Sequence, residues 1–136
     1  ASVKFSFKLN IGCPKKYEPN KSLISWAKKN KSNIKIFNDS KKAASKSDVV
    51  FTDKVISMND NDKVNKAKKL KDFKKFQVNS DVMEKSKNAL FLHCLPRDLE
   101  VSDEVFLGKQ SKVWQQALNR VHVQKSILLY CLRKLR

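Results

Sequence analysis

The stretch Ala89-Leu90-Phe91-Leu92-His93-Cys94-Leu95-Pro96-Arg97 decides the fold and the place of its chemistry. Its first four residues are apolar, so both faces of an extended strand would be apolar, as in a central strand of a parallel sheet. Pro96 lacks a backbone N–H and ends the strand. The strand therefore delivers a histidine, a cysteine and an arginine to the carboxyl edge of a sheet.

Strand and helix patterns alternate on both sides of this stretch. Short apolar runs predict strands at 5–11, 34–37 and 49–51, and helical spacing predicts helices near 21–28, 39–44, 64–73, 80–83 and 103–106. A long helix is expected at about 115–135. This alternation predicts one α/β domain over residues 1–136, a three-layer Rossmann-like fold with a mainly parallel sheet flanked by helices.

Three segments lie at the carboxyl ends of the predicted strands, where open parallel sheets bind their ligands: 13–14, 52–59 and 93–97. We expect the chemistry in the last two. The chain has only two glycines, so it can form neither a GxGxxG motif nor a P-loop. A glycine-rich nucleotide cradle is therefore excluded.

The positive charge of the chain supports a competing hypothesis. Thirty Lys and Arg residues stand against thirteen Asp and Glu, a formal net charge of +17, as in a basic module that binds nucleic acid or another polyanion. The lysines are spread over several predicted helices, often opposite apolar positions, as on solvated helix faces. No RNA-binding aromatic motif or helix-turn-helix spacing accompanies them, so we expect no nucleic-acid partner.

Three cysteines lie far apart, at Cys13, Cys94 and Cys131, without a CxxC pair or a Cys/His metal spacing. We therefore expect no disulfide framework and no metal, and a reducing, cytoplasmic compartment is the simplest setting. No run of about 18 apolar residues predicts a membrane span. On the residues alone, Cys94 can be a structural thiol or one that faces a substrate.

The string His93-Cys94-Leu95-Pro96 as a whole resembles the signature of the ornithine carbamoyltransferases, whereas aspartate carbamoyltransferases have proline at the cysteine position. Five further segments match that family in order along nearly the whole chain: 13–19, 53–59, 71–79, 103–106 and 116–125. The resemblance implies that residues 1–136 are a partial ornithine-binding domain of such an enzyme.

The resemblance also implies a site for L-ornithine. Asp53 would pair with its α-amino group, and Ser57 and Met58 would contact its amino-acid end. Cys94 and the carbonyl of Leu95 would face the reacting δ-nitrogen and the carbamoyl group. A carboxylate suits an ammonium group, which gives this assignment a physical basis.

The implied reaction transfers the carbamoyl group of carbamoyl phosphate to the δ-amine of ornithine, giving citrulline and phosphate in arginine metabolism. It needs no metal or cofactor, because the neutral amine attacks the carbonyl carbon and phosphate leaves. Arg120 would stabilise the carbamoyl oxygen, and Cys94 would steer or accept the amine proton, so these two are the implied catalytic residues. His93 and Arg97 are further candidates, although a structural role is favoured for His93, and a surface charge is as open for Arg97 as a place at the mouth of the site.

Three positions depart from the family pattern. Val55 replaces a tryptophan, Asn59 a glycine and Leu118 a glutamate. Asn59 tolerates the left-handed backbone that glycine favours. These changes bear on the closure of the 53–59 loop over substrate and on the support of Arg120.

Two parts of the family enzyme have no counterpart in this sequence: the N-terminal domain, with its Ser-Thr-Arg-Thr motif for carbamoyl phosphate, and the first strand of the ornithine domain. We therefore expect a piece of a larger protein that partners the N-terminal domain and is inactive alone. A third hypothesis is a non-catalytic remnant that associates with other chains. Full-length members of the family are trimers, assembled largely through the N-terminal domain.

Overall fold

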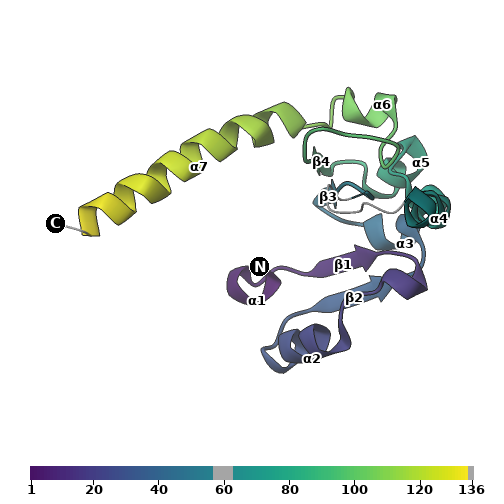
Figure 1. Cartoon of the computed structure of the whole chain (residues 1–136), viewed down its shortest axis with the longest axis horizontal. Helices are drawn as coiled ribbons and strands as arrows, with labels where there is room; N and C mark the ends of the chain where they lie inside the picture. The colour runs from purple at the N-terminus through teal and green to yellow at the C-terminus, as the bar shows by residue number, and fades with distance from the viewer. Residues whose placement is uncertain (57–62, 135–136) are drawn as a thin grey trace.

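Strands and helices alternate in the computed structural model, which describes residues 1–56 and 63–134 (Figure 1). The strands are β1 (Leu9–Gly12), β2 (Ile34–Phe37), β3 (Val49–Thr52) and β4 (Leu90–His93). The helices are α1 (Ser2–Phe5), α2 (Lys21–Lys29), α3 (Ser40–Ala44), α4 (Lys63–Phe73), α5 (Ser80–Met83), α6 (Asp103–Phe106) and α7 (Val113–Lys134), with 3-10 turns η1 (Lys15–Tyr17), η2 (Lys74–Phe76) and η3 (Glu84–Ser86). The predicted α/β alternation is confirmed.

The strands pair in parallel, as expected, but within the described residues they form two separate two-stranded sheets. β1 pairs with β2, and β3 pairs with β4. On its other edge, β4 meets only a loop, where Phe91 exchanges backbone hydrogen bonds with Gln110 and Lys112. β4 thus has a hydrogen-bonding partner along both edges, β3 on one and residue Ser111 of the loop on the other, although Leu90 is 44% exposed.

Polar caps explain where several helices begin. The side-chain oxygens of Asn20, Asp39 and Asn79 each accept a hydrogen bond from a backbone N–H in the first turn of α2, α3 and α5. The first predicted strand, in contrast, begins later than expected. Residues 2–5 form α1, because Phe5 and Phe7 alternate with polar residues without facing a core, and both are exposed.

The core gathers around β4. Phe91 and Val113 are fully buried there, and they share one apolar cluster with residues from α3, α5 and α6. α3 packs against both β1 and β2. Gly12 permits this close approach, because a Cβ at that position would lie 2.9 Å from the Cβ of Ala43.

The last helix, α7, leaves the rest of the molecule after its first turn (Figure 1). Val113 is buried and Gln116 is half-buried, but every residue from Ala117 to Arg133 is exposed. In the described part of the chain, no helix has both the length and the apolar character that crossing a membrane requires. α7 therefore presents its leucines and valines without a covering element among the described residues.

Candidate functional site

The site forms where β3 and β4 end side by side. Thr52 and His93 are partners in the parallel register, so the residues that follow them, Asp53 and Cys94, emerge together at the carboxyl edge. The Sγ atom of Cys94 donates a hydrogen bond to Oδ1 of Asp53 at 2.9 Å. Two residues 41 positions apart in the sequence thus supply one thiol–carboxylate pair.

This contact sets the protonation of both groups. Burial raises the pKa of the Cys94 thiol, and the hydrogen bond to the Asp53 carboxylate raises it further. The same bond, with a second from the backbone N–H of Lys54, lowers the pKa of Asp53. At neutral pH the pair is therefore a neutral thiol and a carboxylate, so Cys94 acts as a proton donor while Asp53 keeps its negative charge.

We expect the raised pKa of Cys94 to slow its alkylation by iodoacetamide, because only the thiolate reacts. The rate should rise with pH about a midpoint above the ordinary value for cysteine. Asp53→Asn removes the carboxylate, so the midpoint should fall and the rate near neutral pH should rise several-fold. Mass spectrometry that follows Cys94 separately from Cys13 and Cys131 measures this.

Asp103→Asn is the matched control for that experiment, since Asp103 pairs with Arg97 and makes no described contact with Cys94. Its alkylation profile should match that of the unmodified chain. An unchanged midpoint in Asp53→Asn would contradict the role of the thiol–carboxylate bond.

His93 lies inside the molecule rather than at the mouth of the site. It is 1% exposed, its Nδ1 lies 2.6 Å from the carbonyl oxygen of Thr52, and its Nε2 lies 2.9 Å from Oε1 of Glu100. Both ring nitrogens therefore lie within hydrogen-bonding distance of an oxygen atom of a neighbouring residue. This geometry gives His93 a structural part: it ties the end of β4 to the end of β3.

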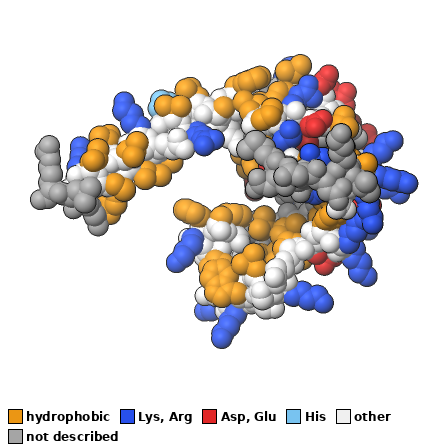
Figure 2. All heavy atoms as spheres, viewed as in Figure 1, with side chains coloured by type: hydrophobic (Ala, Val, Ile, Leu, Met, Phe, Trp, Pro, Cys, Tyr) orange, Lys and Arg blue, Asp and Glu red, His pale blue; other side chains and the backbone are white. Residues whose placement is uncertain are grey.

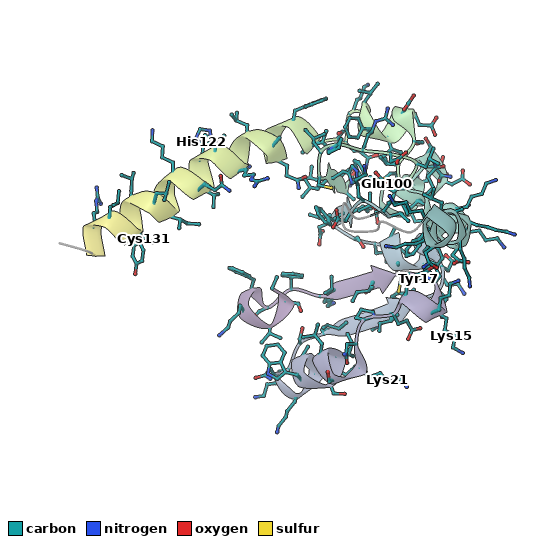
Figure 3. All side chains as sticks on the ribbon, viewed as in Figure 1. Lys15, Tyr17, Lys21, Glu100, His122 and Cys131 are labelled. Atoms are coloured by element: carbon teal, nitrogen blue, oxygen red, sulfur yellow. The ribbon has the colours of Figure 1, made fainter. Side chains whose placement is uncertain are left out.

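Two polar residues in this network were not singled out from the sequence. Glu100 is 5% exposed and accepts hydrogen bonds from His93 and from the backbone N–H of Asp98 at 2.6 Å (labelled in Figure 3). Gln116, on the first turn of α7, accepts one from the backbone N–H of His93 at 3.0 Å. The sequence does contain a signal for Glu100, which is a carboxylate between the apolar residues Leu99 and Val101. A carboxylate in such a position can be buried if it is paired, so it would need a partner inside the molecule.

The side chain of Arg97 interacts with two residues of α6. Its guanidinium forms an ion pair with Asp103 and lies 4.7 Å from the centre of the Phe106 ring. Its charge is thus already engaged within the protein. Leu95, whose carbonyl is a predicted ligand, is exposed on the 93–97 loop, and its peptide bond to Pro96 is cis.

Arg120 lies on α7, one helical turn beyond Gln116 and on the same face of the helix. It is exposed, and its side chain forms no hydrogen bond or ion pair with the described residues. Leu118, which replaces the family's glutamate, is also exposed. Figure 3 places His122 and Cys131 farther along the helix, well away from Glu100. The structure therefore brings Asp53 and Cys94 together but leaves Arg120 at the border of the site.

The remaining predicted residues, Ser57 and Met58, lie outside the described residues, as does Asn59. Val55 is described and is half-buried. In the described part of the chain, no group of three or more His, Cys, Asp and Glu side chains is placed to hold a metal ion. Lysine and arginine side chains are spread around the face shown in Figure 2, over several helices.

A second set of contacts fixes the carboxyl end of β1 near that of β3. Tyr17, in η1 after β1, donates a hydrogen bond at 3.0 Å to Asp72 of α4, and Lys16 forms an ion pair with the same carboxylate. The Tyr17 and Phe73 rings lie 4.9 Å apart. The loops after both strands thus lie on the same edge, which is the edge that carries Asp53 and Cys94.

Comparison with known proteins gives a consistent picture. Residues 1–131 match the family model described as the aspartate/ornithine carbamoyltransferase Asp/Orn-binding domain. An ornithine carbamoyltransferase of Ruthia magnifica is 45% identical over 135 residues, which are 97% of this chain but 44% of that protein. One from Methanocorpusculum labreanum is 42% identical over 132 residues, 95% of this chain and 43% of the relative. The chain thus spans less than half the length of these relatives.

Solved structures agree with this comparison. The ornithine carbamoyltransferase of Pyrococcus furiosus is similar with a TM-score of 0.80 at 33% identity, over 94% of this chain and 42% of that one. The anabolic enzyme of Campylobacter jejuni is similar with a TM-score of 0.85 at 30% identity, over 99% of this chain and 46% of that one. The similarity therefore extends over nearly all of the described structure.

Proposed function

The chain belongs to the aspartate/ornithine carbamoyltransferase family, and from that premise we propose that it is the ornithine-binding half of an ornithine carbamoyltransferase. The contact between Cys94 and Asp53 carries the proposal. It joins the two residues that the family motifs assign to opposite ends of ornithine, at the sheet edge where such ligands bind.

Asp53 supplies the charge that the substrate requires. Its lowered pKa keeps it a carboxylate at neutral pH, and a carboxylate at a strand end can pair with the α-ammonium group of ornithine. Ser57 and Met58 complete the contact with the amino-acid end in this proposal. The neutral Cys94 thiol and the Leu95 carbonyl then face the δ-nitrogen.

In the proposed reaction, the neutral δ-amine attacks the carbonyl carbon of carbamoyl phosphate. A C–N bond forms, the C–O bond to phosphate breaks, and the proton that the attacking amine loses goes to the departing phosphate as citrulline is produced. Arg120 would donate hydrogen bonds to the carbamoyl oxygen, where negative charge develops. Because the Cys94 thiol is neutral, its part is to orient the amine by hydrogen bonding rather than to take its proton.

The proposal assigns carbamoyl phosphate binding to a partner domain. Arg120 is exposed, and more than half of each relative's length lies outside the matched part, so the catalytic arrangement is proposed to need the N-terminal domain of the family. We propose no turnover by this chain alone. We propose that the protein acts in the cytoplasm, a reducing compartment that would keep Cys13, Cys94 and Cys131 as free thiols.

Ornithine binding measured by isothermal titration calorimetry tests this function. We expect the chain to bind L-ornithine and Asp53→Ala to weaken binding by about tenfold or more, because a hydrogen bond to a charged group is worth about 1.5–3 kcal/mol. Asp81→Ala is the matched control, since that carboxylate pairs with Lys41 on the surface. The proposal fails if ornithine gives no binding heat, or if both variants bind it equally well.

A further inference from the structure

A cavity of about 470 Å³ lies between α4 and the loop that follows β4. Its apolar lining comes from three segments: Val55 after β3, Leu70 and Phe73 of α4, and Leu99 after β4. Asp53, Cys94 and Leu95 are not among the residues that line it, so it adjoins the candidate site without belonging to it. Its volume lies within the range of about 300–1,000 Å³ that is usual for small-molecule pockets.

The lining presents apolar surface that the described part of the fold leaves uncovered. Leu99 is 65% exposed, and Val55, Leu70 and Phe73 are only half-buried. These side chains come from segments that are separate in the sequence, yet they face one space. A flat apolar group placed there would remove apolar surface from water on both partners, which favours binding.

Contacts around the cavity hold its lining in place. The centre of the Phe73 ring lies 4.9 Å from that of Tyr17 and 6.1 Å from that of Phe76. Nε2 of Gln77 donates a hydrogen bond at 2.8 Å to the carbonyl oxygen of Leu99, which joins the segment after α4 to the loop after β4. The cavity is therefore largely formed before any ligand arrives, and a preformed site lowers the entropic cost of binding.

Two cations and one carboxylate also line the cavity. Lys71 and Lys74 are exposed, and their ammonium groups form no ion pair with a described residue. Glu100 is 5% exposed, and its Oε1 accepts hydrogen bonds from His93 and from the backbone N–H of Asp98, so little of this carboxylate faces the cavity. The charge that a ligand meets here is therefore positive and lies on the solvent side.

We propose that this cavity binds a small organic anion with a flat apolar body, of the class of the aromatic carboxylates. The apolar body lies against the four apolar lining residues, and the carboxylate pairs with the two lysines. Lysines alone would suit any anion, whereas the apolar lining selects an anion that carries an aromatic group. The proposal concerns a second site and stands apart from ornithine binding.

Titration with naphthoate, followed by the amide chemical shifts of the 136-residue chain in NMR spectra, tests the proposal. A ligand of about 13 non-hydrogen atoms with ordinary ligand efficiency should bind with a Kd of about 1 mM or lower. The largest shifts should fall on Leu70, Phe73 and Leu99. Naphthamide has the same shape without the charge, and it should bind about fivefold more weakly, because each exposed ion pair contributes little.

A matched pair of double variants tests the two lysines. Lys71→Gln/Lys74→Gln should weaken naphthoate binding about fivefold and leave naphthamide binding unchanged. Lys68→Gln/Lys75→Gln removes two exposed lysines that do not line the cavity, and it lowers the net charge by the same amount. Its affinity for naphthoate should match that of the unmodified chain.

A variant of Val55 tests the cavity itself. Val55→Trp places a larger apolar side chain in the lining, so it should occupy the space and weaken the binding of both naphthoate and naphthamide about tenfold. Val55→Ala leaves the space open and should still bind both compounds. Circular dichroism of each variant shows whether the fold is kept. Asp53→Ala should bind naphthoate like the unmodified chain, because Asp53 does not line the cavity.

Three results would overturn the proposal. The first is the absence of saturable naphthoate binding. The second is an equal loss of affinity in the two double-lysine variants, which would indicate attraction to the basic surface as a whole. The third is a folded Val55→Trp variant that binds naphthoate as tightly as the unmodified chain, which would place the ligand elsewhere.

Discussion

Phe91→Ala is expected to lower the free energy of unfolding by about 3–5 kcal/mol, the cost typical of removing a buried phenylalanine. Phe91 is 0% exposed, lies on β4 and stacks beside His93 with ring centres 6.4 Å apart. Its backbone also joins β4 to the 110–112 loop. Because small domains are stable by only about 5–15 kcal/mol, this loss would leave the chain largely unfolded in mild denaturant.

Urea unfolding followed by circular dichroism measures the loss. Phe5→Ala is the matched control, because Phe5 is 78% exposed and its removal should leave the midpoint unchanged. If Phe91→Ala unfolded at the same urea concentration as the unmodified chain, β4 would not be the centre of the core.

Glu100→Ala is expected to lower the free energy of unfolding by about 1–3 kcal/mol, because it leaves the buried Nε2 of His93 without its hydrogen-bond partner. It also deprives the backbone N–H of Asp98 of its acceptor. Both effects act on the loop that carries Cys94, so the Cys94–Asp53 contact should loosen with the core. The same urea experiment measures the change.

A double variant tests whether His93 and Glu100 stabilise the fold as an interacting pair or only by filling space in the interior. The loss in His93→Leu/Glu100→Leu should be smaller than the sum of the two single losses, since the double variant leaves neither partner alone in the interior. Asp81→Ala, in the exposed pair with Lys41, should change the unfolding midpoint little. Additive losses would show that His93 and Glu100 do not act as a pair.

The sequence was a good guide to the fold where apolar residues face a core. β2, β3 and β4 lie within one residue of their predicted positions, and α7 lies close to its predicted range. The sequence predicted the structure poorly where an alternating apolar pattern does not face the hydrophobic core. Phe5 and Phe7 alternate as in a strand but are exposed, and local helix formation prevails at α1.

The sequence predicted those site residues whose positions follow directly from the predicted strands. The positions of Asp53 and Cys94 follow from two strand ends, and adjacent strand ends converge. Glu100 was not singled out, because its role depends on a fold that brings it under His93 from seven residues away. The two-sheet arrangement was also beyond the sequence, since strand patterns specify faces and not which edges pair.

α7 divides the chain into two thermodynamic units. Beyond Gln116 its residues are exposed as far as Arg133, so packing against the core contributes little to the stability of this part of the helix. A helix in water without tertiary contacts follows a gradual helix–coil equilibrium rather than the all-or-none transition of a domain. The helical signal of this protein on heating is thus the sum of a sharp transition for the β4 core and a broad one for α7.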